Sequence, residues 1–103
     1  INAVFCGNDA MASGAYQALA AAGKANTVKV FGFDGAADVI ESIQNKKIMA
    51  TGMQFPKVMA KTAALYADEY FKGKRDFPKK MPVAVELVTQ ENVGEYAGYG
   101  KKE

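Results

Sequence analysis

The stretch TVKVFGFDGAADVIESIQN, residues 27–45, holds a strand pattern, an Asp-Gly pair and a helix pattern in direct succession. The apolar run 27–33 predicts a strand, and the spacing of the apolar residues over 36–45 predicts a helix. Asp34 and Gly35 stand where the strand would pass into the helix. Asp34 therefore has two interpretations, an ordinary turn residue or a carboxylate at the rim of a sheet.

The same alternation of strand and helix patterns runs along the whole chain. Further strands are predicted at 2–6, 47–53 and 83–88, and further helices at 10–22 and 57–73. Parallel strands joined by right-handed helical crossovers produce this order of elements. The sequence therefore predicts an α/β fold made of parallel βαβ units.

Residues at the helix starts and on the helix faces support these assignments. Asp9 is a candidate N-cap for the first helix, and Pro56 suits the first turn of the third. The residues expected to face inward are Met11, Ala15, Leu19 and Ala22 in the first helix and Val39, Ile40 and Ile43 in the second. An apolar stripe runs along the third helix through Met59, Ala63, Tyr66 and Tyr70.

Composition narrows the classes of protein to which the chain can belong. Of its 103 residues 50% are hydrophobic, and 13 basic against 11 acidic residues give a net charge of +2. This balance argues against a nucleic-acid-binding protein, which would need basic residues clustered on one face. The single cysteine, Cys6, is expected to be buried, and no histidine is present to act as a base or a metal ligand. We therefore expect no catalysis, no cofactor and no metal site.

Polar side chains follow three of the predicted strands at the point where each strand ends. They are Asn8, Asp34 and Gln54. Because ligands of open parallel sheets bind beyond the carboxyl ends of the strands, these side chains could form one site. A carboxylate accepts two hydroxyl hydrogen bonds, and each carboxamide both donates and accepts, which suits a polyhydroxylated ligand. Turn formers and helix caps would also occupy such positions, so spacing alone leaves both interpretations open.

Other ligands fit these residues less well. Phosphate binding at a helix N-terminus favours a turn without acidic side chains, whereas Asp9 and Asp34 occupy the relevant turns. The sequence GFDG at 32–35 lacks the glycine spacing of dinucleotide-binding proteins. Asp34 and Asp38 do not reproduce a calcium-binding loop. A ligand rich in hydroxyl groups remains the favoured hypothesis.

Four segments that together cover most of the chain have a recognisable sequence. They are AVFCGNDAMASGAYQALAAAGK (3–24), VKVFGFDGAADVIESI (28–43), IMATGMQFP (48–56) and PVAVELVTQEN (82–92). They resemble the C-terminal third of ribose-binding proteins, the periplasmic solute receptors of bacterial ABC sugar importers. The resemblance implies a type I periplasmic-binding-protein fold that binds ribose or a similar monosaccharide without chemistry. In that family the positions matching Asn8, Asp34 and Gln54 hydrogen-bond the pentose.

The resemblance also implies a division of the chain between two lobes. Residues 1–53 would belong to the C-terminal sugar-binding lobe and 54–56 to a hinge, while 57–85 would supply a helix and a strand of the N-terminal lobe. Residues 86–103 would return through a second hinge, near 86–89, into the tail. The aromatic residues and arginines that enclose the sugar in this family lie upstream, so the chain is expected to be a C-terminal fragment.

The implied partners are a monosaccharide, an ABC permease in the membrane and the upstream part of the same protein, in a periplasmic or extracytoplasmic location. No nucleic-acid partner is expected. Strand edges left exposed could drive self-association of the chain, which alone should bind ribose weakly or not measurably.

An alternative is the effector-binding core of a LacI-type transcriptional repressor. Such repressors carry runs similar to GNDAMASGA (7–15) and GFDGAAD (32–38). The segment ATGMQFP (50–56), followed by the strand VELVT (85–89), favours the sugar receptor. A DNA-binding headpiece or a signal peptide upstream would distinguish the two.

Overall fold

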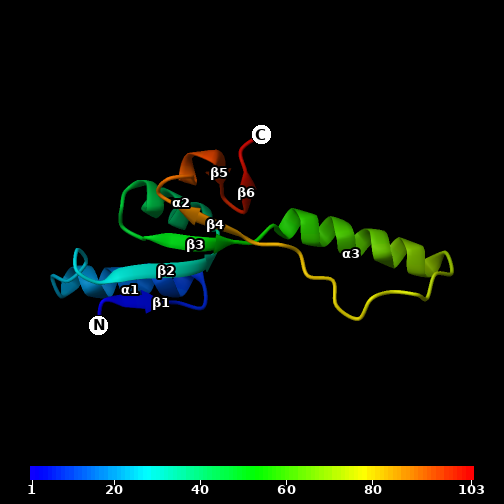
Figure 1. The fold of residues 1–103 in the computed structure, drawn as a ribbon, viewed down its shortest axis with the longest axis horizontal. Coiled ribbons are helices and arrows are strands. Elements are labelled where there is room, and N and C mark those ends of the chain that lie inside the picture. The colour runs from blue at the N-terminus through cyan, green and yellow to red at the C-terminus, as the bar shows by residue number, and fades with distance from the viewer.

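The computed structural model describes all 103 residues and confirms the predicted α/β class. Its main sheet has four strands in the order β1-β2-β3-β4, and the last two strands form a separate hairpin (Figure 1). The strands are β1 (Ala3–Phe5), β2 (Lys29–Asp34), β3 (Ala50–Met53), β4 (Glu86–Thr89), β5 (Tyr96–Ala97) and β6 (Gly100–Lys101). The helices are α1 (Asp9–Ala21), α2 (Ala37–Gln44), α3 (Pro56–Phe71) and the short 3-10 helix η1 (Val93–Glu95).

The strands of the main sheet are not all parallel. β1, β2 and β3 are parallel and are joined by α1 and α2, as predicted for βαβ units. β4 runs antiparallel to β3, with Met53 opposite Glu86, so the expectation of a parallel fourth strand is wrong. The cause is the path of the chain, because α3 leaves the sheet after β3 and an extended segment returns to the same end of β3 (Figure 1). The strand predicted at 83–88 begins only at Glu86, since residues 83–85 lie beyond the end of β3.

The core lies between the main sheet and the two helices α1 and α2. Its buried residues are Cys6, Ala12, Val30, Val39, Ile40, Ile43, Ile48, Met53, Val88, Val93 and Tyr96. The predictions that Val39, Ile40 and Ile43 face inward, and that Cys6 is buried, are confirmed.

The inward face of α1 is only partly the predicted one. Ala12 is fully buried and Met11 is 57% exposed, so the expectation for Met11 is wrong. Ala15 and Leu19 do pack against the core, whereas Ala22 is exposed.

A close approach between α1 and β2 explains this orientation. A methyl group placed on Gly32 would lie 3.2 Å from the Cβ atom of Ala12, which is tighter than ordinary van der Waals contact. Two small residues therefore let the helix lie directly on the strand. A methionine side chain at this contact would be overpacked, and Met11 points outward instead.

The opposite face of the sheet carries apolar side chains that remain open to solvent. Phe5 is 74% exposed and Leu87 is 64% exposed, although Val88 beside it is fully buried. Phe31 pairs with Phe5 across β1 and β2 and is half-buried. Because successive side chains of a strand point to opposite faces, one face of this sheet packs on helices and the other does not. Neighbouring large apolar side chains exposed on one sheet face are a feature of interaction sites.

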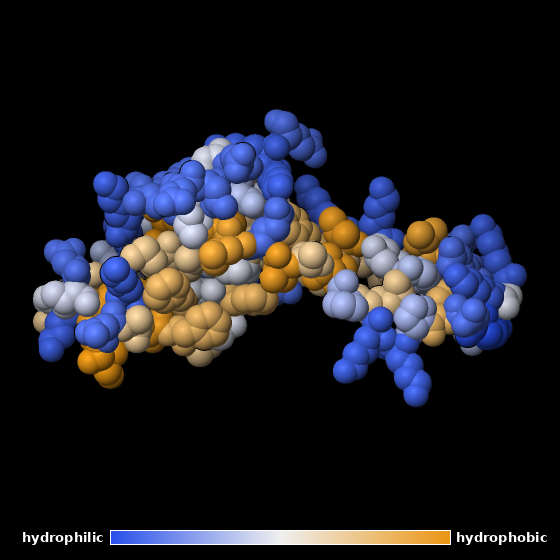
Figure 2. Space-filling model, in the orientation of Figure 1, coloured by the Kyte–Doolittle hydropathy of each residue, from blue (hydrophilic) through white to orange (hydrophobic).

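α3 projects away from the rest of the chain and adds nothing to the core. It begins at Pro56, as predicted, and has no buried residue. The chain therefore measures 59 × 28 × 17 Å, with hydrophobic patches along this arm (Figure 2). Its apolar stripe is only partly covered, because Tyr66 packs edge-on against Phe77 with ring centroids 5.6 Å apart while Tyr70 is 47% exposed. None of the helices is both long and apolar enough to span a membrane.

The tail folds back against α2 and the end of the sheet, and its last residues form a small hairpin of β5 and β6. Tyr96 is buried, and Lys101 forms an ion pair with Glu86 of β4 at 3.0 Å. The backbone N–H of Tyr99 donates a hydrogen bond to the carbonyl of Gly35 at 2.8 Å. The tail is thus attached to the turn that follows Asp34.

Candidate ligand-binding site

The strand register places the three predicted site residues at one edge of the sheet. Phe5 of β1 pairs with Phe31 of β2, so Asn8 and Asp34 each follow three residues after this pair. Asp34 in turn pairs with the last residue of β3, and Gln54 comes directly after it. All three side chains therefore lie at the carboxyl ends of parallel strands, and each is half-buried.

Two of the three predicted residues are in direct contact. The side-chain Nε2 of Gln54 donates a hydrogen bond to Oδ1 of Asp34 at 2.6 Å. The backbone N–H of Gln54 donates to the backbone carbonyl of Asp34 at 2.8 Å. These bonds leave Oδ2 of Asp34 and the carbonyl oxygen of the Gln54 side chain without a side-chain partner.

Asp34 has an uncommon backbone conformation. Its φ angle is 132°, and Gly35 follows with φ 91°. Positive φ values are unfavourable for residues other than glycine, so neighbouring contacts must hold Asp34 in place. Strained backbone of this kind is concentrated at binding and catalytic sites.

Asn8 lies at the same edge but contacts neither Asp34 nor Gln54. Its Oδ1 accepts a hydrogen bond from the backbone N–H of Met11 at 2.9 Å, which makes Asn8 the N-cap of α1. No hydrogen bond of the structure uses its Nδ2 group, which remains able to donate. A cap and a donor to a ligand are therefore compatible roles for this residue.

Asp9 was the predicted N-cap of α1, and that prediction is wrong. Asp9 is the first residue of the helix and is 2% exposed. Its Oδ2 accepts the backbone N–H groups of Gly35 at 2.8 Å and Ala36 at 2.7 Å. Its Oδ1 accepts the hydroxyl of Thr51 on β3 at 2.7 Å. The only sequence signal for this network is a threonine within an apolar strand, and no spacing pairs it with residue 9.

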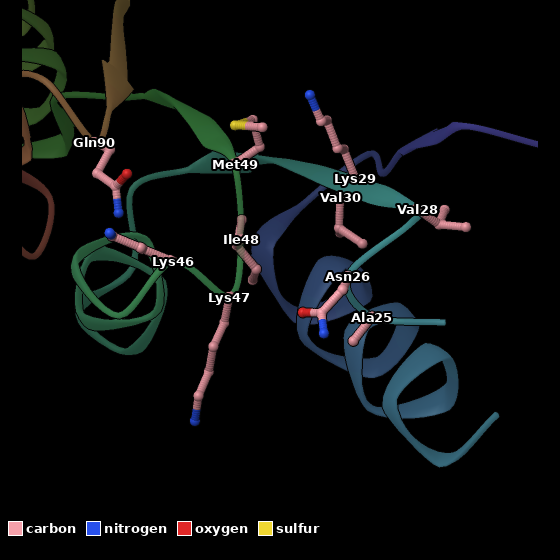
Figure 3. A pocket seen from close by; sticks show the side chains of 10 residues that line it. All are labelled: Ala25, Asn26, Val28, Lys29, Val30, Lys46, Lys47, Ile48, Met49 and Gln90. Atoms are coloured by element: carbon pink, nitrogen blue, oxygen red, sulfur yellow. The ribbon is translucent and has the colours of Figure 1, made fainter. Parts of the chain in front are cut away.

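A hollow of about 200 Å³ lies at the opposite edge of the sheet, near the start of β2 and β3 (Figure 3). Its lining includes Lys29, Lys46, Lys47 and Gln90. Lys29 and Lys47 point away from one another in Figure 3, so the ammonium groups do not converge on one point. None of the predicted site residues lines this hollow. The candidate site is therefore placed at the opposite edge, where the parallel strands have their carboxyl ends.

The chemistry of the candidate site is that of a hydrogen-bonding surface. One carboxylate and two carboxamides supply acceptors and donors at a half-buried rim, and each hydroxyl group of a sugar needs both. No group of three or more histidine, cysteine, aspartate or glutamate residues could hold a metal ion. The arrangement can bind and orient a polyhydroxylated molecule.

Comparison with known proteins assigns the chain to a family. The sequence model of the periplasmic binding protein domain matches residues 1–75. The chain belongs to the periplasmic binding protein family. The ribose import binding protein RbsB of Bacillus subtilis is 40% identical to it over 90 residues, which is 87% of this chain and 28% of that protein. The D-apiose import binding protein of Paraburkholderia graminis is 41% identical over 95 residues, 91% of this chain and 30% of that protein.

Solved structures of the family share the fold. A periplasmic solute binding protein of an ABC transporter from Actinobacillus succinogenes, with bound D-allose, matches with a TM-score of 0.86 and 34% identity over 93% of this chain and 33% of that one. A solute binding protein from Bacillus halodurans, with bound myo-inositol, matches with a TM-score of 0.84 and 38% identity over the same shares. The chain thus spans about a third of the length of these solved relatives and less than a third of the length of the curated relatives.

These relatives confirm the resemblance to ribose-binding proteins and the type I fold predicted from the sequence. Their names describe import binding proteins and solute binding proteins. This agrees with the expectation of a binding protein that catalyses no reaction and is located in the periplasm or elsewhere outside the cytoplasm. They differ in their named ligands, which include ribose, apiose, allose and inositol. None of those named here is a repressor, so nothing favours the LacI-type alternative.

Proposed function

We propose that this chain is the C-terminal part of the solute-binding component of a bacterial ABC sugar importer, and that it binds D-ribose or a similar monosaccharide. The observation that carries the proposal is the Asp34–Gln54 pair at the carboxyl end of the sheet. Relatives named for ribose, apiose and allose support the choice of a monosaccharide.

Each site residue has a distinct role in the proposed complex. Oδ2 of Asp34 accepts hydrogen bonds from one or two neighbouring hydroxyl groups of the sugar. The side-chain carbonyl of Gln54 accepts another, because its Nε2 group is already bound to Asp34. Nδ2 of Asn8 donates to a sugar oxygen while its Oδ1 caps α1. A sugar with adjacent hydroxyl groups uses all three.

We propose that the rest of the site comes from an upstream part of a longer protein. Residues 1–53 would belong to one lobe and 57–85 to the other, with 54–56 and 86–89 as hinges between them. The projecting helix α3 and the solvent-exposed Phe5 and Leu87 support this division, since they offer apolar surface for another segment to cover. Without that cover, the same surface would favour self-association of the chain.

Water exclusion would then require both lobes. On the open rim of one lobe each hydrogen bond contributes only about 0.5 to 1.5 kcal/mol net, because bulk water competes for the same groups. Enclosure between two lobes lowers the local dielectric and strengthens each bond. The proposed partners are therefore the sugar, the upstream lobe and a membrane permease, with no role for a nucleic acid.

The experiment that tests the proposed function is titration calorimetry of the complete receptor, meaning the longer protein that contains this chain. D-ribose, D-allose, D-apiose and myo-inositol are injected in turn, with sucrose as a disaccharide control. We expect micromolar or tighter binding of at least one of the four. Absence of heat with all four, from a protein shown to be folded, would remove the basis for a sugar receptor.

A further inference from the structure

Asp9 is a buried carboxylate that the proposed sugar contacts do not use. It is 2% exposed, and no lysine or arginine forms an ion pair with it. A buried charge is costly unless hydrogen bonds or dipoles compensate for it. Three donors do so here, two backbone N–H groups and the Thr51 hydroxyl, all within 2.8 Å.

The position of Asp9 between two helices adds to this compensation. Asp9 is the first residue of α1, and Ala36 is the N-cap of α2. Ala36 has no side-chain oxygen and α2 has no side-chain cap of its own, while the Asp9 carboxylate of the neighbouring helix accepts the backbone N–H of this N-cap residue. The positive ends of two helix dipoles thus face one negative charge.

Two of the three donors that Asp9 binds, the backbone N–H groups of Gly35 and Ala36, belong to the turn that carries Asp34. Gly35 follows Asp34 directly, and both have positive φ angles. The Asp9 bonds to Gly35 and Ala36 fix the turn from the α1 side, while the Gln54 backbone N–H holds the Asp34 carbonyl from the β3 side. The direction of the Asp34 carboxylate follows from these fixed points.

We propose that Asp9 is a positioning residue of the sugar site, which holds the Asp34 turn in its binding conformation without touching the sugar. The inference rests on the proposed function, because it assigns Asp9 a role through Asp34. Thr51 takes part by fixing the second oxygen of the Asp9 carboxylate to β3. Because the φ angle of Asp34 is unfavourable, loss of these bonds lets Asp34 relax to other conformations, and only a fraction of the molecules then binds.

The test compares four variants of the complete receptor by titration calorimetry with the sugar that the wild type binds best. Asp9→Ala removes all three hydrogen bonds and should weaken binding by about tenfold or more. Asp9→Asn keeps an oxygen for Gly35 and Ala36, so it should recover most of that loss. Thr51→Val removes one bond and should weaken binding by about threefold.

The matched control is Ile43→Ala, which opens a cavity in the core at the far end of α2. It lowers the free energy of unfolding without touching the turn, so its affinity should stay within about twofold of the wild type below the unfolding transition. If Asp9 served stability alone, Asp9→Ala would behave like this control, and the proposal would be wrong.

An NMR measurement in the absence of sugar gives a second readout that does not depend on folding yield. The amide protons of Gly35 and Ala36 should shift strongly in Asp9→Asn and Thr51→Val but not in Ile43→Ala. Unchanged amide shifts together with full affinity in Asp9→Asn and Thr51→Val would overturn the positioning role. A wild type that binds no sugar would instead refute the proposed function, so the two failures are distinguishable.

Discussion

The side-chain amide of Gln54 donates a 2.6 Å hydrogen bond to the carboxylate of Asp34, although the two residues belong to the ends of different strands. A second bond joins their backbones at 2.8 Å. Together they fix the orientation of Asp34 before any ligand arrives. A site arranged in this way loses less conformational entropy on binding.

Replacing Gln54 tests this arrangement. Gln54→Met keeps the length of the side chain and removes its amide, so Asp34 loses a donor and the sugar loses an acceptor. In the complete receptor we expect sugar affinity to fall by about 1 to 3 kcal/mol, measured by titration calorimetry. Gln90→Met is the matched control, because Gln90 lies at the opposite edge of the sheet. Equal affinities of the two variants would count against a role for Gln54.

Gly52 is a packing contact for an aromatic ring next to the site. A methyl group at Gly52 would come within 2.6 Å of the Phe33 ring. Gly52→Ala should therefore lower the free energy of unfolding by about 1 to 3 kcal/mol, measured by urea denaturation of the complete receptor. Gly14→Ala has open space on helix α1 and should instead raise it by about 0.5 to 1 kcal/mol. A stabilising Gly52→Ala would contradict the packing described here.

The attachment of the tail should weaken at alkaline pH. Burial raises the pKa of the Tyr96 hydroxyl above its ordinary value, and the nearby Glu86 carboxylate adds to the shift. The pKa of Lys101 is also raised, first by its hydrogen bond to Glu86 and second by the negative charge of Glu86. Both groups hold their protons more strongly in the folded state, so their stabilising contribution is complete below their ordinary pKa values. It is lost as the pH rises through the raised values.

Urea unfolding of the complete receptor from about pH 8 to about pH 11 measures this loss. We expect stability to fall above about pH 10, and the fall should be less steep in Tyr96→Phe and in Glu86→Gln. A fall of the same steepness in both variants and the wild type would show that the tail contacts do not cause it.

The two segments proposed as hinges lie side by side. Met53, which precedes the segment 54–56, pairs with Glu86, the first residue of the segment 86–89. Because the chain leaves and re-enters the sheet at one place, rotation at these element ends would move α3 relative to the sheet. If the sugar binds between two lobes, its binding should change the position of α3 relative to the sheet.

Spin-label distances in the complete receptor, with Cys6 replaced by alanine, test the hinge. Labels at Lys47→Cys and Lys72→Cys report on the sheet and on the far end of α3. We expect their separation to change by several ångström when sugar is added, while a control pair at Lys24→Cys and Lys47→Cys stays constant. A constant distance in both pairs at saturating sugar would exclude hinge motion at these segments.

Local patterns predicted much of the fold and the edge of the sheet at which the candidate site residues lie. The spacing of Val39, Ile40 and Ile43 identified the buried face of α2, because helical periodicity is visible in a single segment. The strand ends likewise placed Asn8 and Asp34 at one edge, since parallel strands share the direction of their carboxyl ends.

What the sequence did not predict depends on contacts between distant segments. The antiparallel direction of β4 follows from the path of α3, which no periodicity describes. Asp9 looked like a helix cap, but its partners are Gly35, Ala36 and Thr51, brought to it by the packing of α1 on Gly32. The outward position of Met11 has the same origin.

The most direct test of a sugar site at this edge is titration calorimetry of Asp34→Ala in the complete receptor, with Asp38→Ala as control. Asp38 is an exposed carboxylate four residues further along, in the first turn of α2. We expect Asp34→Ala to weaken sugar binding by about 2 to 4 kcal/mol, because hydroxyl groups in the closed site lose their acceptor, and Asp38→Ala to bind like the wild type. A loss smaller than about threefold in Asp34→Ala would contradict the assignment of the site.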